Sequence, residues 1–485
     1  MISFDIDLSV PKIHQWSWDG QQWVSPAGWV RPFPHPQLDA VCAQDGPHVS
    51  FTVRESAQHG DFIRLDLTKT TAKLEAGMLG RAPIYLRHRD RRLSGSWQIT
   101  DLMADRLPFG ALVDRAVARL LTRQPRYTSD TLFPDIICLT ERATAMAGAA
   151  GLELAYPEPV RSPGPAPTNG DPTGAFASIV FAHLSGRGTD ATDLSGGVDS
   201  AVVAYDVTQA SNNPVASFGL IVPGRHREAQ RARRRAMANA FGLTDTEIFA
   251  ANHLPFGPGH RQRLHDPASS DDREAFDALA QRAAEAGAYS LAIGIGGESL
   301  TTTTVTGTGS AVHGRPRTPR WLGGKACSAL DQIGDNAAPA GHLTAQTLLA
   351  LSSRTPGILA AGLWPVAPLA DPHLLRLCRV LPSEWMAGKR LLRERLASGG
   401  LDPAVAGATS PDSFEQVSRL GLHRYGLPLL ARFLTEGLLL SDLGYIEPLK
   451  LQETVNAARR TNVIDPRLAE VVRLELGLRR IWGEA

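Results

Sequence analysis

The alternation of short apolar runs with helical segments between residues 176 and 293 constrains the fold of this chain more than any other feature. The run "PVASFGLIV" at 214–222 has the length and composition of a buried strand, and the helical pattern "REAQRARRRAMANAFG" follows it at 227–242. Strands that alternate with helices of this length form a doubly wound, mostly parallel sheet. We therefore expect an α/β domain whose ligands bind at the carboxyl ends of the strands.

The first part of the chain has a different pattern. Apolar runs such as "HVSFTV" at 48–53, "DFIRLDL" at 61–67 and "APIYLRH" at 82–88 are separated by turn residues, as in strands of an all-β domain. An amphipathic pattern predicts a helix over 111–123. We expect an N-terminal domain that is mostly a β sandwich.

A proline- and glycine-rich stretch, "PEPVRSPGPAPTNGDPTG" at 157–174, predicts a linker between the two parts. The predicted domains are therefore residues 1–156 and residues 175–485. Residues 301–345 are rich in threonine, glycine and proline, which predicts a mobile loop or lid. Beyond Leu348 the pattern is mostly helical.

One glycine-rich turn stands where a strand ends and a helix begins. It reads "SGGVDS" and comprises Ser195, Gly196, Gly197, Val198, Asp199 and Ser200. Glycines let backbone N–H groups close around a phosphate, and the dipole of the following helix adds partial positive charge. Asp199 would repel a bare phosphate, so its presence predicts a bridging Mg²⁺. The turn therefore predicts a site for pyrophosphate and a metal ion.

Composition excludes several other functions. The net charge is +1, which provides no global attraction to nucleic acid or to an anionic membrane. The four cysteines form no CxxC pair, so neither a disulfide framework nor a zinc site is expected, and this argues against a tRNA-modifying enzyme. The N-terminal residues lack a signal-peptide pattern and no apolar run reaches membrane-spanning length. We expect a soluble cytoplasmic protein.

The turn "SGGVDS" resembles the pyrophosphate loop of the ATP pyrophosphatase superfamily, and further motifs resemble its asparagine-synthetase branch. "GIGGES" at 294–299 is similar to that branch's second glycine-rich turn. The resemblance implies that Gly296 and Gly297 contact ATP and that Glu298 shares Mg²⁺ with Asp199. The "GKRLLR" stretch implies a phosphate or substrate contact for Lys389, and Arg393 is a further candidate.

The N-terminal half is similar to a degenerate glutamine amidotransferase domain of the Ntn-hydrolase type, on the stretch "GRAPIYLRHRDRRLSGSWQITDL" at 80–102. Glutamine-dependent members use a cysteine that directly follows the initiator methionine as nucleophile, and this chain has Ile2 there. We therefore expect no glutaminase activity. The family's catalytic lysine is also missing, because the matching segment offers only Ser410 and Asp412.

The resemblance implies an ATP-dependent synthetase that adenylates a carboxylate and captures it with an amine. Members with a silent N-terminal domain include β-lactam synthetases and lasso-peptide cyclases, and the C-terminal helices resemble the cyclases most. The expected cofactors are ATP and Mg²⁺, and the catalytic candidates are Lys389 and Glu298. The expected substrate is a peptide or small molecule with a carboxylate and an amine. A precursor peptide or a leader peptidase is a possible partner.

Two alternatives remain open from the sequence. The first is an ammonia-using enzyme similar to asparagine synthetase. The second is a pseudoenzyme that binds nucleotide without catalysis, which the missing lysine and Ile295 within the second turn would favour.

Overall fold

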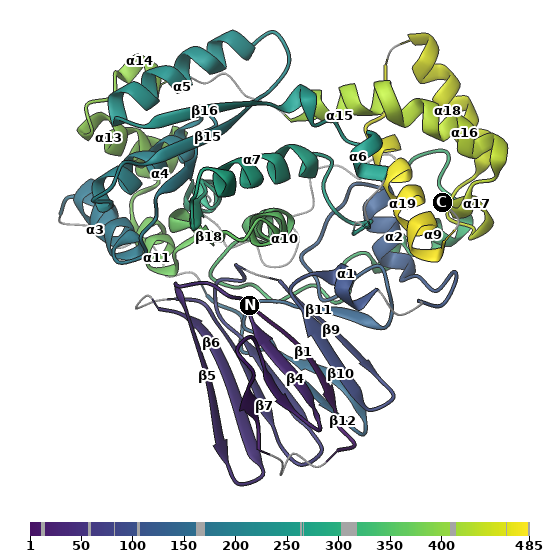
Figure 1. Cartoon of the computed structure of the whole chain (residues 1–485). Helices are drawn as coiled ribbons and strands as arrows, with labels where there is room; N and C mark the ends of the chain where they lie inside the picture. Colours follow the sequence, from purple (N-terminus) through teal and green to yellow (C-terminus); the bar gives the residue numbers. More distant parts are fainter. Residues whose placement is uncertain are drawn as a thin grey trace.

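The described part of the chain folds into two antiparallel sheets, one parallel sheet and many helices (Figure 1). The computed structural model describes residues 1–10, 15–56, 60–81, 83–103, 107–161, 170–261, 264, 266–301, 318–407, 414–461 and 463–483. The N-terminal strands lie at the bottom of Figure 1, and the parallel sheet and the C-terminal helices lie above them.

The N-terminal strands form a sandwich, as predicted. One antiparallel sheet has the order β11 (Ile136–Leu139), β9 (Ile84–Arg89), β10 (Arg92–Ser96), β1 (Ile2–Asp7), β4 (Gly28–Pro32), β3 (Trp23–Ser25) and β2 (Ser17–Trp18). The other has the order β13 (Gly151–Ala155), β12 (Thr144–Gly148), β8 (Ala72–Ala76), β7 (Phe62–Leu67), β6 (His48–Glu55) and β5 (Leu38–Asp45). Alternate residues of β1 and β6, among them Phe4 and Phe51, meet in a shared core because successive side chains of a strand point to opposite faces.

The third sheet is parallel and confirms the predicted α/β domain. Its order is β16 (Thr244–Phe249), β15 (Ala216–Ile221), β14 (Ala191–Asp193), β17 (Ser290–Ala292) and β18 (Trp364–Val366). The order reverses at β14, which pairs with β15 on one side and β17 on the other. In open parallel sheets such a switch point is where ligands bind, beyond the carboxyl ends of the strands.

Two groups of helices cover this sheet. One group packs around α4 (Val198–Ala210) and contains α3 (Pro172–Leu184), α5 (Arg227–Phe241) and α13 (Arg390–Ser398). The other pairs α7 (Arg273–Glu285) with α10 (Ala345–Ala360). Shorter helices that bear on the site are α8 (Gly297–Thr301), α11 (Pro372–Val380), α14 (Pro403–Ala406) and the 3₁₀ helix η3 (Pro368–Ala370).

A second core joins parts of the chain that are far apart in sequence. It combines α2 (Asp114–Leu121) and α9 (Gly324–Ser328) with the C-terminal helices α16 (Leu427–Glu436), α17 (Leu439–Asp442), α18 (Pro448–Thr461) and α19 (Leu468–Trp482). The helix predicted over 111–123 is therefore present, but it packs against the C-terminal helices. The domain bounds stay a prediction, since this core draws on both sides of residue 156.

Two local features differ from the sequence-based expectation. Helix α3 begins at Pro172, inside the predicted linker, because Asp171 accepts a hydrogen bond from the N–H of Thr173 and proline suits the first helical turn. Strand β18 was not predicted, because it is only three residues long and contains Pro365. Its place at the edge of the sheet tolerates the proline. No helix among the described residues combines the length and apolarity needed to cross a bilayer.

Candidate active site

The first glycine turn connects β14 to α4 at the switch point of the parallel sheet. Gly196 has φ +94°, a conformation that glycine adopts without strain. The hydroxyl of Ser200 accepts a hydrogen bond from the N–H of Ser195 at 3.1 Å and lies 2.9 Å from the Ser195 hydroxyl. The N–H of Gly197 donates to Ser195 Oγ at 3.2 Å. Both serine hydroxyls therefore stabilise the turn itself, besides lying at the N-terminus of α4.

Helix α5 supports this turn from behind. Gln230 donates from Nε2 to the Ser195 carbonyl at 3.0 Å, and Arg233 donates to the Gly196 carbonyl at 3.3 Å. Arg234 is fully buried and forms an ion pair with Asp245 at 2.5 Å. The charge-rich segment "RHREAQRARRR" at 225–235 predicts a solvated helix face. That expectation is wrong for the buried Gln230 and Arg234.

The second glycine turn packs directly on the first. A Cβ at Gly294 would lie 2.8 Å from the Ser200 backbone nitrogen, and a Cβ at Gly297 would overlap the Asp199 carboxylate. Gly296 has φ +115°, and a Cβ there would lie 2.6 Å from the backbone nitrogen of Ala370. These glycines are thus required for close approach, and the structure brings together the two turns that the sequence separates by about a hundred residues.

Asp199 faces Lys389 across the site. Lys389 Nζ donates to Asp199 Oδ2 at 2.6 Å, although the two residues are 190 positions apart. Their side chains are 30% and 22% exposed, so a ligand from solvent reaches both. Lys389 has φ +60° and follows Gly388 at φ +59°, which turns the chain sharply before α13. Asp199 lies in the first turn of α4, where the helix dipole favours a negative charge.

Arg393 holds the backbone around Lys389. Its guanidinium donates to the carbonyls of Gly388 at 2.8 Å and of Ala406, the last residue of α14, at 2.5 Å. Both of these contacts are to backbone carbonyls, so Arg393 shapes the turn that presents Lys389.

Glu298 lies at the start of α8, one residue after the glycine that touches Asp199. The side chain is exposed, and its Oε2 accepts a hydrogen bond from Gln346 of α10 at 2.5 Å. The next residue, Ser299, is buried and shares hydrogen bonds with the hydroxyls of Thr344 and Thr347. The start of helix α10 therefore holds the second glycine turn through Glu298 and Ser299.

The carboxylates suit a metal ion that is shared with phosphates. Among the described residues, no group of three or more His, Cys, Asp or Glu side chains has the arrangement of a metal site. Asp199 Oδ1 is buried and has no hydrogen-bond partner among the described residues. One anionic oxygen is therefore available to a cation. Mg²⁺ is usually bound by one or two carboxylates together with substrate phosphates. Asp199 offers one such carboxylate, and the shared role of Glu298 stays a prediction.

Several predicted residues lie elsewhere. Ser410 and Asp412 fall outside the described residues, as do residues 302–317 of the predicted lid. The described remainder of that lid is packed and not loose, because Trp321 and Ala326 are buried in the second core. Lys325 pairs with Asp114 at 3.3 Å, away from the glycine turns. The turn "LADP" at 369–372 predicts a helix cap at Asp371, and Asp371 caps α11 in the structure.

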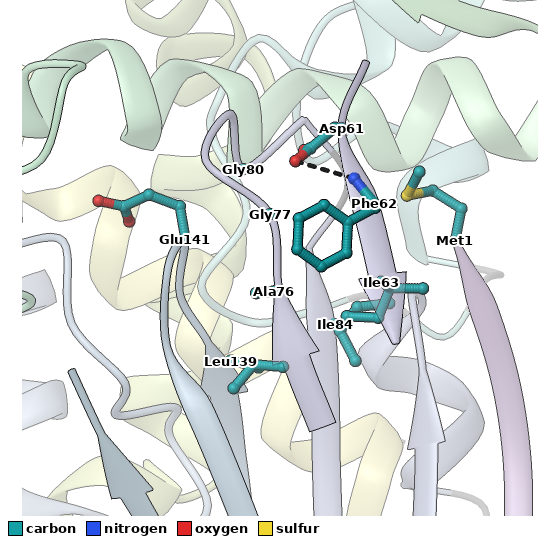
Figure 2. A pocket seen from close by; sticks show the side chains of 10 residues that line it. All are labelled: Met1, Asp61, Phe62, Ile63, Ala76, Gly77, Gly80, Ile84, Leu139 and Glu141. Carbon is teal, nitrogen blue, oxygen red and sulfur yellow. Dashed lines mark hydrogen bonds between the residues drawn. The ribbon is translucent and has the colours of Figure 1, made fainter. Parts of the chain in front are cut away.

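The N-terminal domain contains a small pocket, which Figure 2 shows at the ends of β7 and β9. Its volume is about 20 Å³, and it is lined by Met1, Asp61, Phe62, Ile63, Ala76, Gly77, Gly80, Ile84, Leu139 and Glu141. A space of this size holds about one water molecule. It does not accommodate a glutamine side chain.

A larger pocket of about 450 Å³ lies beside α2, between Leu112 and Asn336. Its charged groups already pair with each other or with neighbours: Arg115 and Asn336 donate to Asp130, and Tyr445 donates to Asp114. None of the predicted site residues lines it.

No family model matches the chain, and no curated protein matches it. One solved structure to which it is similar is the U34-tRNA thiolase NcsA from Methanococcus maripaludis with its 4Fe-4S cluster. The two share 14% identity over 65% of this chain and 80% of that chain, with a TM-score of 0.28. A TM-score this low does not establish a common fold, so the interpretation of the site depends on its own geometry.

Proposed function

We propose that the chain is an ATP-dependent amide-bond synthetase that adenylates a substrate carboxylate and captures it with a substrate amine. The observation that carries this proposal is the junction of the two glycine turns at Asp199 and Lys389. It combines backbone N–H groups at a helix N-terminus, an anionic oxygen that no described residue contacts by a hydrogen bond, and a lysine ammonium, all at the switch point of a parallel sheet. Triphosphate binding uses these groups together.

Each group has a defined role in this proposal. The N–H groups between Gly196 and Ser200 bind the β- and γ-phosphates, and Lys389 neutralises the charge that develops on the leaving group. Asp199 and Glu298 hold Mg²⁺, which when bound supplies positive charge to the phosphate oxygens. Gln230 and Arg233 keep the turn in place before the reaction, so little reorganisation is required.

The first step forms a mixed anhydride. A carboxylate oxygen of the substrate attacks the α-phosphorus of ATP, and the bond between that phosphorus and the bridging oxygen breaks. Pyrophosphate leaves with the bonding electrons. An amine then attacks the acyl carbon and loses one proton to the medium, and AMP leaves with its oxygen. When one substrate carries both groups, the second step is intramolecular, which can lower its barrier by roughly 7–11 kcal/mol.

The N-terminal pocket favours a substrate amine over ammonia derived from glutamine. Its volume of about 20 Å³ excludes glutamine, and Ile2 stands where glutamine-dependent relatives have a nucleophilic cysteine. We propose a macrolactam closure of the kind that lasso-peptide cyclases perform. A precursor peptide is then the substrate, and a leader peptidase is the expected partner.

ATP–pyrophosphate exchange tests the proposal. We expect exchange that depends on a carboxylate substrate, measured with peptides that carry a free N-terminal amine and an internal Asp or Glu side chain. Asp199→Ala should lower it by about 10²–10³-fold, whereas Asp114→Ala, which removes a lysine-paired carboxylate of α2, should leave it unchanged. Turnover of small acids with ammonium alone would instead support an ammonia-using enzyme. Nucleotide binding without exchange for any carboxylate would support the pseudoenzyme.

A further inference from the structure

A chain of buried charged and polar groups crosses the boundary between the N-terminal sandwich and the parallel sheet. Arg81 donates to both oxygens of Glu55, at 2.6 and 2.8 Å, and Arg187 donates to Glu55 at 3.0 Å. The side chains of Arg81 and Glu55 have no exposed surface. Glu55 ends β6 of the sandwich, whereas Arg187 follows α3 of the C-terminal half.

The network continues through His183 of α3. Arg81 donates to His183 Nε2 at 3.0 Å, and His183 Nδ1 lies 2.8 Å from Asp371 Oδ2. Since a guanidinium only donates, Nε2 must be the unprotonated nitrogen, and Nδ1–H therefore donates to Asp371. Desolvation and the Arg81 charge lower the pKa of His183 to about 4, so this histidine is neutral. The order of donors from Arg81 to Asp371 is thereby fixed.

Asp371 leads from this network to the second glycine turn. Its carboxylate caps α11 by accepting from the N–H groups of His373 at 2.7 Å and Leu374 at 3.4 Å. The residues just before it form η3, and Gly296 packs on the backbone of Leu369 and Ala370 so closely that a Cβ would collide there. Helix α8, which begins with Gly297, contacts both η3 and α11.

A second connection leads from Glu55 to the same turn. Trp364 of β18 is fully buried and donates from Nε1 to Glu55 at 3.2 Å. Two residues later, the Val366 carbonyl accepts from the N–H of Ile293 at 2.8 Å, directly before Gly294. Two independent chains of contacts thus begin at Glu55 and end on either side of the second glycine turn.

We propose that this buried network, comprising Glu55, Arg81, Arg187, His183, Asp371 and Trp364, positions the second glycine turn for nucleotide binding. The N-terminal sandwich is then a structural partner of the synthetase site and not an independent appendage. Asp371 and Trp364 are the positioning residues through which it acts. The importance of the turn rests on the function proposed above, but the mechanical link does not require any ligand.

Hydrogen exchange of the ligand-free, full-length protein tests this link. Asp371→Ser removes the partner of His183 while serine still caps α11, and Trp364→Phe removes the donor to Glu55. We expect each variant to speed amide exchange in peptides that cover residues 293–301 by about tenfold. Amide exchange in α18, which lies at the upper right of Figure 1 and away from α3, α11 and β18, is expected to stay within twofold of wild type.

Asp130→Asn is the matched control, since Asp130 is a buried carboxylate that pairs with Arg115 and Arg119 outside this network. When Asp130→Asn is compared with the two network variants at an equal loss of thermal stability, the amide exchange of residues 293–301 should be as in wild type. The proposal is overturned if Asp371→Ser and Trp364→Phe leave these amides as in wild type, or if Asp130→Asn accelerates them equally. No nucleotide is added in this experiment. If the protein failed to bind ATP, the proposed function would be refuted, but hydrogen exchange would still decide whether the network positions the turn.

Discussion

Two ion pairs show how differently the two regions of the molecule use charge. Arg81 and Glu55 at the domain boundary have no exposed side-chain surface, whereas Lys389 and Asp199 at the glycine turns are 30% and 22% exposed. Every oxygen of Glu55 has a protein donor, but Asp199 Oδ1 has none among the described residues. The first pair is a closed structural unit. The second is partly open to solvent, which the proposed binding of phosphates and a metal ion requires.

Removal of one member of the buried pair should have the largest effect on stability. In Arg81→Ala, Glu55 keeps its charge in a buried position with one fewer partner, so we expect a loss of about 3–5 kcal/mol in the free energy of unfolding. Lys389→Ala should cost less than about 1 kcal/mol, because that pair is partly exposed. Urea unfolding measures both. Equal losses for the two variants would contradict the distinction.

Removal of the carboxylate at the glycine turns should have the largest effect on activity. Asp199→Ala is expected to lower ATP–pyrophosphate exchange by about 10²–10³-fold, the usual effect of losing one electrostatic group from such a site. Its stability should stay near that of wild type. Retention of more than a tenth of the exchange rate would exclude Asp199 from the phosphate and metal site.

Removal of Lys389, the lysine of the exposed pair, should lower activity somewhat less than removal of Asp199. Lys389→Met is expected to reduce kcat/KM by about 10²-fold, which corresponds to about 2.7 kcal/mol of transition-state stabilisation. Lys325→Met is the matched control, because Lys325 also pairs with an aspartate but lies on α9, beside the second core. The control should stay within twofold of wild type. Equal activity of the two variants would argue that Lys389 is only a structural partner of Asp199.

The pH dependence of stability tests the buried network, because His183 is part of it. The pKa of His183 is lowered to about 4 by burial and by Arg81, below the ordinary value of 6.5. The unfolded chain therefore binds a proton more readily, so the contribution of His183 is present above pH 6.5 and is lost as the pH falls toward 4. Between pH 8 and pH 5 the loss should be about 2 kcal/mol.

Other buried acids change stability in the opposite direction, since burial raises the pKa of Glu141 to about 7 and that of Asp193 to about 6. The His183 contribution is therefore best measured as a difference between wild type and His183→Asn, which keeps a donor toward Asp371. This difference should shrink as the pH falls. A difference that does not vary with pH would contradict the assigned neutral state.

The sequence was sufficient to predict the architecture and both glycine turns, because strand length, helical periodicity and glycine spacing are local signals. The close contact between the turns follows from the topology of a parallel sheet. The pairing of Lys389 with Asp199 was not predictable, since a gap of 190 residues leaves no periodic signal. Gln230 and Arg234 lie on a helix so rich in charge that it resembles a solvated face.

The buried network was even less predictable from the sequence. Glu55 and Arg81 are ordinary charged residues near the ends of strands, and such residues are usually exposed. Only the packing of the sandwich against the parallel sheet shows that they are buried. For the same reason α2 was assigned to the N-terminal domain, although its apolar face packs against helices more than 300 residues further along the chain.

Calorimetric titration of the full-length protein with ATP and magnesium tests the central claim most directly. We predict saturable binding of one nucleotide per chain in the wild type, retained in Lys325→Met and lost in Asp199→Ala. Absence of binding heat in the wild type, or equal binding by Asp199→Ala, would show that the two glycine turns do not form a nucleotide site.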